Sequence, residues 1–184
     1  MRTVKIDKNK GVVFWITGLS GSGKTRLGYK IKKDITKKYG PTILLSGDDI
    51  RNFFEFKKYS YEDRLKVVSG YSRLCNQFSK QGINVIFCVV GLMHVIHEWN
   101  RKNIKNYIEI YIKSTINKVK KLSKKRIYAQ KYIQNVVGFD IKPEFPKKPN
   151  IIINNNFSKP MNSLSQELLA KINKVAKLNN RISR

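Results

Sequence analysis

The chain has 184 residues, with 38 Lys and Arg against 12 Asp and Glu, a net charge of +26 and 41% hydrophobic residues. This length and hydrophobic content suit one folded domain over residues 1–184 and exclude an intrinsically disordered chain. No apolar run reaches the roughly 18 residues that a membrane span needs. The N-terminus shows no signal-peptide pattern, so the sequence predicts a cytoplasmic protein.

The positive charge admits two interpretations. A basic face can attract nucleic acid or phosphorylated ligands. Alternatively, the lysines form a solvated surface around a site for an anionic small molecule, because they are spread along the whole chain. Basic residues interleave with aromatic ones, as single-strand binding requires, only around residues 57–61. The sequence therefore favours a small anionic substrate over nucleic acid.

The two cysteines and two histidines limit the kinds of site that the chain can form. Cys75 and Cys88 are too few for a disulfide framework and are expected to be small buried hydrophobic residues. The absence of a Cys/His cluster argues against a zinc site. His94 and His97 are expected on the surface of a helix near the acceptor pocket, with a contact to the acceptor as the alternative.

The first half of the chain alternates apolar runs with helical patterns. An apolar, β-branched run at residues 12–17 ends in glycines and predicts a buried strand. Leu27, Ile31 and Ile35 have helical spacing, which predicts a helix over residues 23–38, and a second strand follows at 42–45. Helices are expected at 48–56 and 61–80, the second with Ser60 as its N-cap.

The second half continues this alternation, with a strand at 83–90, a helix at 93–103, a strand at 107–112 and a helix at 115–122. Residues 123–149 lack one clear period and carry Gly138 and three prolines, which indicates a long functional loop. A strand at 151–153 and a C-terminal helix at 163–178 follow. This series predicts a parallel sheet covered on both faces, with ligands at the strand exits after residues 17, 45 and 90 and at the loop after residue 122.

Residues 18–25 match the phosphate-binding pattern G-x-x-x-x-G-K-[ST] at every position, directly after a strand and at the start of a helix. The glycines let backbone N–H groups turn toward a phosphate, and the helix N-terminus adds positive potential. Lys24 is expected to reach the β- and γ-phosphates, and the Thr25 hydroxyl is expected to bind Mg²⁺. The sequence thus predicts a purine triphosphate site formed by Gly18, Leu19, Ser20, Gly21, Ser22, Gly23, Lys24 and Thr25.

Acidic and basic side chains follow the second predicted strand. Asp48 could accept a proton from an acceptor hydroxyl or hold magnesium, and Arg51 could bind an anionic group of the acceptor. Equally, Asp48 and Asp49 could simply interact with a helix dipole. Arg64 leaves a similar choice, since Asp63 and Arg64 could form an ordinary ion pair on a helix surface.

Residues 14–25, Phe-Trp-Ile-Thr-Gly-Leu-Ser-Gly-Ser-Gly-Lys-Thr, resemble the opening of the adenylylsulfate kinases. The resemblance continues at Gly47-Asp48-Asp49-Ile50-Arg51, at Tyr59-Ser60 with Asp63-Arg64, and from Asn135 to Asp140 with Pro146. It covers about residues 11–154. The fold that it implies is α/β, a P-loop NTPase three-layer sandwich with a central parallel five-stranded sheet and a lid over about residues 123–149.

This resemblance also implies an activity. The family transfers the γ-phosphoryl group of ATP to the ribose 3′-hydroxyl of a sulfated nucleotide, using Mg²⁺, as a homodimer with a mobile lid. Carried over to this chain, Asp48 becomes the base or magnesium organiser, and Lys24 stabilises the transferred group. The remaining positions become acceptor-binding residues (Arg51, Tyr59, Arg64, Val136, Gly138) and lid residues (Lys125, Tyr128).

The departures from the family pattern fall mainly on the acceptor side. Ser46 replaces the first acid of Asp-Gly-Asp, and Val136 aligns with the second aromatic residue of the base sandwich. Residues 67–70 (Val-Val-Ser-Gly) replace Asn-Ile-Arg-Arg, residues 90–93 (Val-Gly-Leu-Met) replace Ile-Ser-Pro-Tyr, and residues 125–128 (Lys-Arg-Ile-Tyr) replace Lys-Gly-Leu-Tyr. Loss of groups that pair with an acceptor predicts that a different acceptor is used.

The chain also resembles the cytidine diphosphoramidate kinases, a branch that phosphorylates a cytidine nucleotide in capsule phosphoramidate biosynthesis. A weaker base sandwich suits a smaller pyrimidine, and a neutral amide terminus needs fewer arginines than a sulfate. A divergent adenylylsulfate kinase is the alternative. A nucleic-acid-binding ATPase or polynucleotide kinase is suggested only by the charge, and a nucleotide-binding regulator without catalysis only by Ser46.

Overall fold

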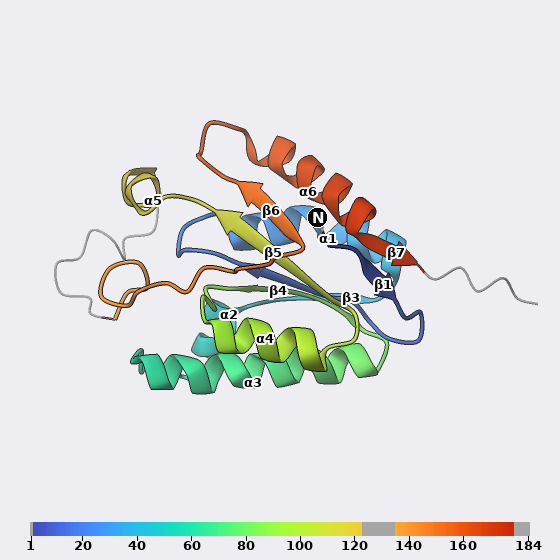
Figure 1. The fold of residues 1–184 in the computed structure, drawn as a ribbon, viewed down its shortest axis with the longest axis horizontal. Coiled ribbons are helices and arrows are strands. Elements are labelled where there is room, and N and C mark those ends of the chain that lie inside the picture. The colour runs from blue at the N-terminus through green and yellow to red at the C-terminus, as the bar shows by residue number, and fades with distance from the viewer. Residues whose placement is uncertain (1, 123–134, 179–184) are drawn as a thin grey trace, which may run out of the picture.

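The computed structural model describes residues 2–122 and 135–178, and its centre is a five-stranded parallel sheet (Figure 1). The strand order is β3-β4-β2-β5-β6, and every neighbouring pair is parallel. These strands are β2 (Val13–Thr17), β3 (Thr42–Ser46), β4 (Asn84–Val89), β5 (Tyr107–Lys113) and β6 (Ile151–Asn154). The structure therefore confirms the predicted α/β class and the five-stranded parallel sheet.

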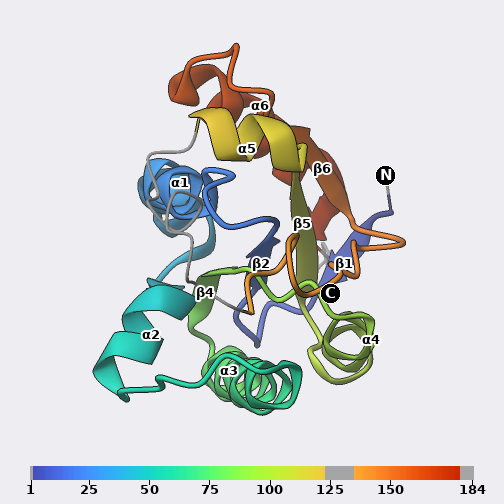
Figure 2. The same ribbon diagram turned by 90° about the vertical axis from the view of Figure 1, so that its left-hand side faces the viewer.

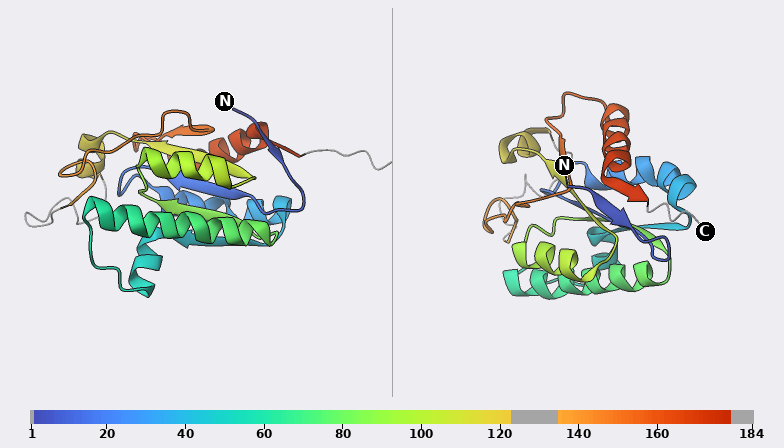
Figure 3. Two further views of the ribbon diagram at one scale, coloured as in Figure 1. Left: turned by 60° about the horizontal axis from the view of Figure 1, so that its bottom comes forward. Right: turned by 45° about the vertical axis from the view of Figure 1, so that its right-hand side comes forward.

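Helices cover both faces of this sheet, which completes three layers (Figures 1 and 2). One face carries α1 (Lys24–Tyr39) and α6 (Met161–Val175), and the other carries α3 (Tyr61–Lys80) and α4 (His94–Asn103). The left view of Figure 3 shows α3 and α4 side by side. Two short helices, α2 (Gly47–Phe53) and α5 (Ile116–Leu122), follow β3 and β5 at the carboxyl end of the sheet.

The two faces hold separate cores because successive side chains of a strand point in opposite directions. In β2, Phe14 and Ile16 pack with α1 and α6, while Val13 and Trp15 pack with α3 and α4. Every residue of β2 and β4 is buried, as expected for a parallel sheet covered on both faces. Such burial explains why these strands read as continuous apolar runs.

The C-terminal helix is shorter than the predicted 163–178. Helix α6 ends at Val175, and the next three residues form β7 (Ala176–Leu178), which pairs in parallel with β1 (Val4–Ile6). The right view of Figure 3 shows these two strands together. The prediction was wrong there because the pairing joins residues at the two ends of the chain, which no local pattern reveals. Helix α2 also ends earlier than predicted, at Phe53.

The structure confirms the prediction for the two cysteines. Cys75 and Cys88 are buried and carry free thiols. Burial raises the pKa of the Cys88 thiol to about 12, so this thiol stays protonated at neutral pH. No helix in the described part of the chain is long and apolar enough to cross a membrane.

Candidate active site

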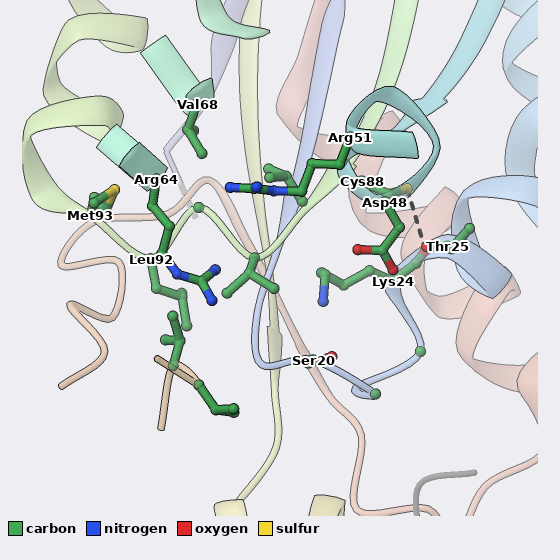
Figure 4. A pocket seen from close by; sticks show the side chains of 18 of the residues that line it. Ser20, Lys24, Thr25, Asp48, Arg51, Arg64, Val68, Cys88, Leu92 and Met93 are labelled. Atoms are coloured by element: carbon green, nitrogen blue, oxygen red, sulfur yellow. Dashed lines mark hydrogen bonds between the residues drawn. The ribbon is translucent and has the colours of Figure 1, made fainter. Parts of the chain in front are cut away.

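A cavity of about 870 Å³ opens at the carboxyl ends of the strands. Its walls come from the loop after β2, helix α2, helix α3, the exit of β4, residues 135–142 and the loop between β6 and α6. Figure 4 shows Lys24 and Asp48 on one side of this cavity and Arg64 with Leu92 on the other. Ligands of doubly wound sheets bind at this edge, so the cavity is the candidate active site.

The loop between β2 and α1 has the conformation that a phosphate cradle needs. Gly18, Gly21 and Gly23 all have positive φ, a region that glycine adopts without strain. A Cβ on Gly18 would lie 2.6 Å from the carbonyl oxygen of Ile112, so no larger residue fits there. Lys24 is 8% exposed and donates a hydrogen bond of 2.8 Å from Nζ to the Leu19 carbonyl. This bond holds the ammonium group over the loop.

The predicted triphosphate residues divide into two groups. Ser20, Gly21, Gly23, Lys24 and Thr25 line the cavity. The other three support the loop from behind: Gly18 lies against β5, Leu19 packs with Leu92, Tyr111 and Val119, and Ser22 is buried and accepts a hydrogen bond from Asn155.

The structure separates the two aspartates that the sequence left equivalent. Ser46 is the N-cap of α2; its hydroxyl accepts a hydrogen bond from the Asp49 N–H and donates one of 2.7 Å to the Asp49 carboxylate. Asp49 therefore supports the N-cap of the helix. Asp48 lines the cavity, and Figure 4 shows its carboxylate beside Lys24 and Thr25.

Two arginines and one tyrosine form the opposite wall. The guanidinium groups of Arg51 and Arg64 lie over the Tyr59 ring, at 4.4 and 5.1 Å from its centroid. Arg51 donates to the carbonyls of Phe56 and Lys58, and Arg64 donates to those of Tyr59 and Asn135. Burial, and then the charge of Arg51, lower the pKa of Arg64. Two cations held this close favour an anionic ligand.

The structure does not support the alternative in which Asp63 and Arg64 form an ion pair. Asp63 instead accepts a hydrogen bond of 2.7 Å from the Ser60 hydroxyl, and its N–H donates to the same oxygen, so the two residues cap α3. Ser60 is thus the N-cap that the sequence predicted. Because Asp63 is used at the cap, Arg64 directs its guanidinium toward the cavity (Figure 4).

The described part of the predicted lid, residues 135–149, is attached to the N-terminus of α4. A Glu144 carboxylate oxygen accepts a hydrogen bond of 2.5 Å from the His94 N–H, and the Glu144 N–H donates to the Leu92 carbonyl. The His94 ring also contacts the Phe145 carbonyl at 2.9 Å. Lys125 and Tyr128, the two predicted lid residues, lie outside the described residues.

The two predicted acceptor residues in this segment lie in different places. Val136 is buried and lines the cavity. Gly138 does not line it; with φ of 95° it makes a tight turn, and its missing side chain lets Leu19 and Ile116 approach. The prediction for Gly138 is corrected accordingly, because the turn faces the small apolar cluster behind the phosphate loop.

His97 is not on the helix surface as the sequence suggested. Its side chain is 1% exposed, on the inward face of α4 with Ile96 and Asn100, and its Nε2 lies 2.8 Å from the Gly91 carbonyl oxygen. The partner that makes this burial possible, Glu109, sits on the neighbouring strand β5 and is not recognisable from the local sequence.

Sequence reasoning missed several residues that line the cavity. Tyr71 and Lys142 belong to this group, and so does the loop after β6, which contributes Asn155, Phe157, Lys159, Pro160 and Met161. Asn155 is 3% exposed and donates to the Ser22 carbonyl, which fixes the phosphate loop to β6. The rule that places ligands at strand exits could have found this loop, since the strand before it was predicted.

A parallel sheet with a glycine-rich phosphate loop, a buried lysine and a facing pair of arginines defines a P-loop kinase. A model of the adenylylsulphate kinase family matches residues 10–154, and the chain belongs to that family of ATP-using nucleotide kinases. The match begins before β2 and ends with β6, so it spans the whole sheet and most of the cavity.

Individual relatives agree with this assignment. A cytidine diphosphoramidate kinase of Campylobacter jejuni is 32% identical over 92% of this chain and 99% of its own length. An adenylyl-sulfate kinase of Clostridium acetobutylicum is also 32% identical, over 81% of this chain and 77% of its own length. The structure of an APS kinase of Mycobacterium tuberculosis in complex with AMPPNP and APS shares the fold, with a TM-score of 0.80 and 20% identity over 89% of this chain and 98% of that one.

Proposed function

We propose that this kinase transfers the γ-phosphoryl group of ATP to the ribose 3′-hydroxyl of a 5′-modified nucleotide, and that the acceptor is cytidine 5′-diphosphoramidate in capsule phosphoramidate biosynthesis. The observation that carries this choice is the cytidine diphosphoramidate kinase of Campylobacter jejuni, which aligns with this chain over 99% of its own length.

The position of the sequence departures supports a changed acceptor. Val68, Gly91, Leu92, Met93 and Val136 all line the cavity, so the replacements at these positions face the ligand. Val68 follows Arg64 by one turn of α3 and makes the wall beside it apolar (Figure 4). Ser69 and Gly70, where the family has two arginines, do not line this cavity, and Gly70 is exposed. The proposal therefore rests on the apolar wall and not on those two positions.

Magnesium fits the donor set on the ATP side. The Thr25 hydroxyl and the Asp48 carboxylate line the cavity beside Lys24, and both supply the hard oxygen ligands that Mg²⁺ prefers. The described residues contain no group of three His, Cys, Asp or Glu residues that could hold a metal ion by itself. This agrees with an ion held mainly by ATP phosphates and water. When bound, Mg²⁺ would neutralise charge on the β- and γ-phosphates.

Each side chain of the site then has its own role in the phosphoryl transfer. The ribose 3′-oxygen forms a bond to the γ-phosphorus in line with the bond that breaks, and ADP leaves with that bond's electron pair. Lys24 neutralises charge that develops on the phosphoryl oxygens. Asp48 orients the 3′-hydroxyl and takes its proton. Arg51 and Arg64 hold the acceptor's phosphates, and Tyr59 and Val136 lie against its base.

The family implies two further features that we include in the proposal. The chain would form one kinase domain that works as a homodimer, and residues 123–149 would close over the phosphates with Lys125 and Tyr128. The hydrogen bond between Glu144 and the N-terminus of α4 supports the lid, because it fixes one end of that segment. Sedimentation of the purified chain would test the dimer.

Phosphoryl transfer to a panel of acceptors tests the proposed substrate. With ATP and Mg²⁺, we expect the highest kcat/KM with cytidine 5′-diphosphoramidate and the new phosphate on the 3′-oxygen, as read by phosphorus NMR. A preference for adenylylsulfate would contradict the cytidine assignment and make the chain a divergent adenylylsulfate kinase, a choice that the relative from Clostridium acetobutylicum keeps open. Phosphorylation of an oligonucleotide instead would support the nucleic-acid interpretation of the charge.

Replacing Arg64 with lysine should raise the acceptor KM about tenfold or more, because lysine keeps the charge but loses the planar, two-point hydrogen bonding. The KM for ATP should stay within about twofold, since the phosphate loop is on the other side of the cavity. Steady-state kinetics with each substrate varied in turn would measure both. Arg73, exposed on the same helix, provides the matched control Arg73→Lys, which should behave as the parent protein. An equal rise of both KM values would argue against an acceptor role.

A further inference from the structure

A buried polar cluster contacts Gly91, the first residue of the segment Gly91–Met93 that lines the cavity and that we call the acceptor wall. His97 on α4 and Glu109 on β5 are 1% and 0% exposed, and His97 Nδ1 lies 3.4 Å from Glu109 Oε1. The other carboxylate oxygen, Oε2, accepts two hydrogen bonds from Arg101, at 3.0 and 2.8 Å. Among the described residues, neither His97 Nδ1 nor Glu109 Oε1 has a hydrogen-bond partner, although the two atoms lie in close contact.

The hydrogen bond between His97 and the Gly91 carbonyl determines which ring nitrogen of His97 carries a hydrogen. The Gly91 carbonyl can only accept, so the His97 nitrogen that lies 2.8 Å from it, Nε2, must carry a hydrogen. In the neutral imidazole, Nδ1 is then an acceptor and faces an oxygen that is also an acceptor when Glu109 is ionised. Two buried acceptors in contact are costly unless a proton lies between them.

We propose that Glu109 and His97 share one proton between Oε1 and Nδ1, and that this pair positions the Gly91 carbonyl and with it the acceptor wall. Every polar atom of the pair is then satisfied: Oε2 accepts from Arg101, Oε1–H donates to Nδ1, and Nε2–H donates to Gly91. His97 and Glu109 are positioning residues, since neither lines the cavity.

Burial disfavours the charged form of both side chains, which favours Glu109 Oε1 as the atom that carries the shared proton. Burial lowers the pKa of His97 to about 4, so the ring does not hold a second proton. Burial also raises the pKa of Glu109, although the charge of Arg101 opposes the shift. The other titratable groups that face or surround the pair are His94 on α4, Glu144 in the described part of the predicted lid, Tyr107 on β5 and Cys75 on α3.

The link to function runs through the exit of β4. Gly91 has φ of 37° and turns the chain so that Gly91, Leu92 and Met93 line the cavity. The preceding carbonyl, that of Val90, accepts a hydrogen bond of 2.5 Å from Thr17 at the end of β2. Two neighbouring carbonyls are therefore fixed by buried donors, and loss of the His97 bond frees one of them. This step rests on the proposed function, because it takes Gly91–Met93 as an acceptor wall.

The position of the shared proton can be tested without any substrate, by nitrogen NMR of protein that carries ¹⁵N-labelled histidine. The chain has only two histidines, so the signals that vanish in His97→Leu belong to His97. We expect His97 to remain the Nε2–H tautomer from pH 5.5 to 8.5, with Nδ1 unprotonated and a downfield carboxyl proton that shows no one-bond coupling to it. Titration of His97 near its ordinary pKa, or the Nδ1–H tautomer, would overturn the proposal. This measurement decides the shared proton even if every acceptor of the panel fails.

Kinetics with the best acceptor test the positioning role. His97→Leu should raise the acceptor KM about tenfold and leave the ATP KM within about twofold. Glu109→Gln should keep both close to the parent values, because its amide N–H can donate to Nδ1 permanently and its oxygen can accept from Arg101. In the parent protein the acceptor KM should rise at alkaline pH as the proton leaves, whereas in Glu109→Gln it should stay flat.

A matched control separates positioning from stability. Ile96 is 2% exposed on the same helix and packs in the apolar core between α3, α4 and the sheet, so Ile96→Val should lower the melting temperature without changing the acceptor KM. If Glu109→Gln proves as damaging as His97→Leu, an ionised carboxylate is needed and the shared proton is refuted. If His97→Leu lowers only the melting temperature, the positioning role is refuted.

Discussion

Replacement of Lys24 by methionine is expected to reduce kcat about a thousandfold, the largest effect of any single change in this chain. The ammonium group is buried at the phosphate loop and bonded to the Leu19 carbonyl, where it would meet the transferred phosphoryl group. Methionine keeps most of the length and apolar packing of the side chain and removes the ammonium group, with its charge and its hydrogen bond to Leu19. Single-turnover rates with ATP, Mg²⁺ and the preferred acceptor would measure the loss.

The matched control for this prediction is Lys30→Met. Lys30 is exposed on the same helix, so its loss removes an equal charge without touching the cavity. The control should keep the parent kcat, and both variants should melt cooperatively near the parent temperature. A kcat for Lys24→Met within about tenfold of the parent would mean that this loop does not act on the transferred phosphate.

The second large effect is expected at Asp48. Asp48→Asn should lower kcat about a hundredfold or more, since the amide cannot take the 3′-hydroxyl proton and is a poorer ligand for Mg²⁺. The Mg²⁺ concentration at half-maximal rate should rise as well. Initial rates over a Mg²⁺ series would measure both changes, and thermal melting of Asp48→Asn would show how much of the loss comes from stability.

The neighbouring aspartate offers a sharp comparison. Asp49→Asn should retain most of the activity and lose about 1 kcal/mol of stability, because its carboxylate interacts with the Ser46 cap. The two isosteric changes should therefore have opposite profiles, one catalytic and one structural. Lower activity in Asp49→Asn than in Asp48→Asn would reverse the assignment of the two residues.

Much of this architecture follows from local sequence alone. Residues 13–17 form a strand because their apolar, β-branched run is bounded by glycines, and residues 18–25 form the phosphate loop because glycine permits positive φ there. The alternation of such strands with helical patterns leaves a parallel sheet as the stable arrangement. Five of the eight residues predicted for the triphosphate site line the cavity, and their binding of ATP stays a prediction.

The acceptor side depended on contacts between segments that lie far apart in the sequence. Gly138 was predicted to bind the acceptor, yet its turn packs against Leu19 and Ile116, and which face of that turn meets the cavity is decided by the packing. The loop after β6 joined the site only because β6 is the last strand of the sheet and its exit lies beside the phosphate loop. Neither relation leaves a periodic signal in the sequence.

The sequence by itself determined the five strands of the central sheet, the helices on its faces, the phosphate loop and the family, because these depend on the spacing and conformational preferences of neighbouring residues. Only the tertiary structure decided that Asp48 faces the cavity while Asp49 supports the N-cap of α2, and that β1 pairs with β7. It alone also showed that His97 is buried against Glu109. Burial and hydrogen-bond pairing are properties of contacts formed across the fold, and they give a side chain its function only once those contacts exist.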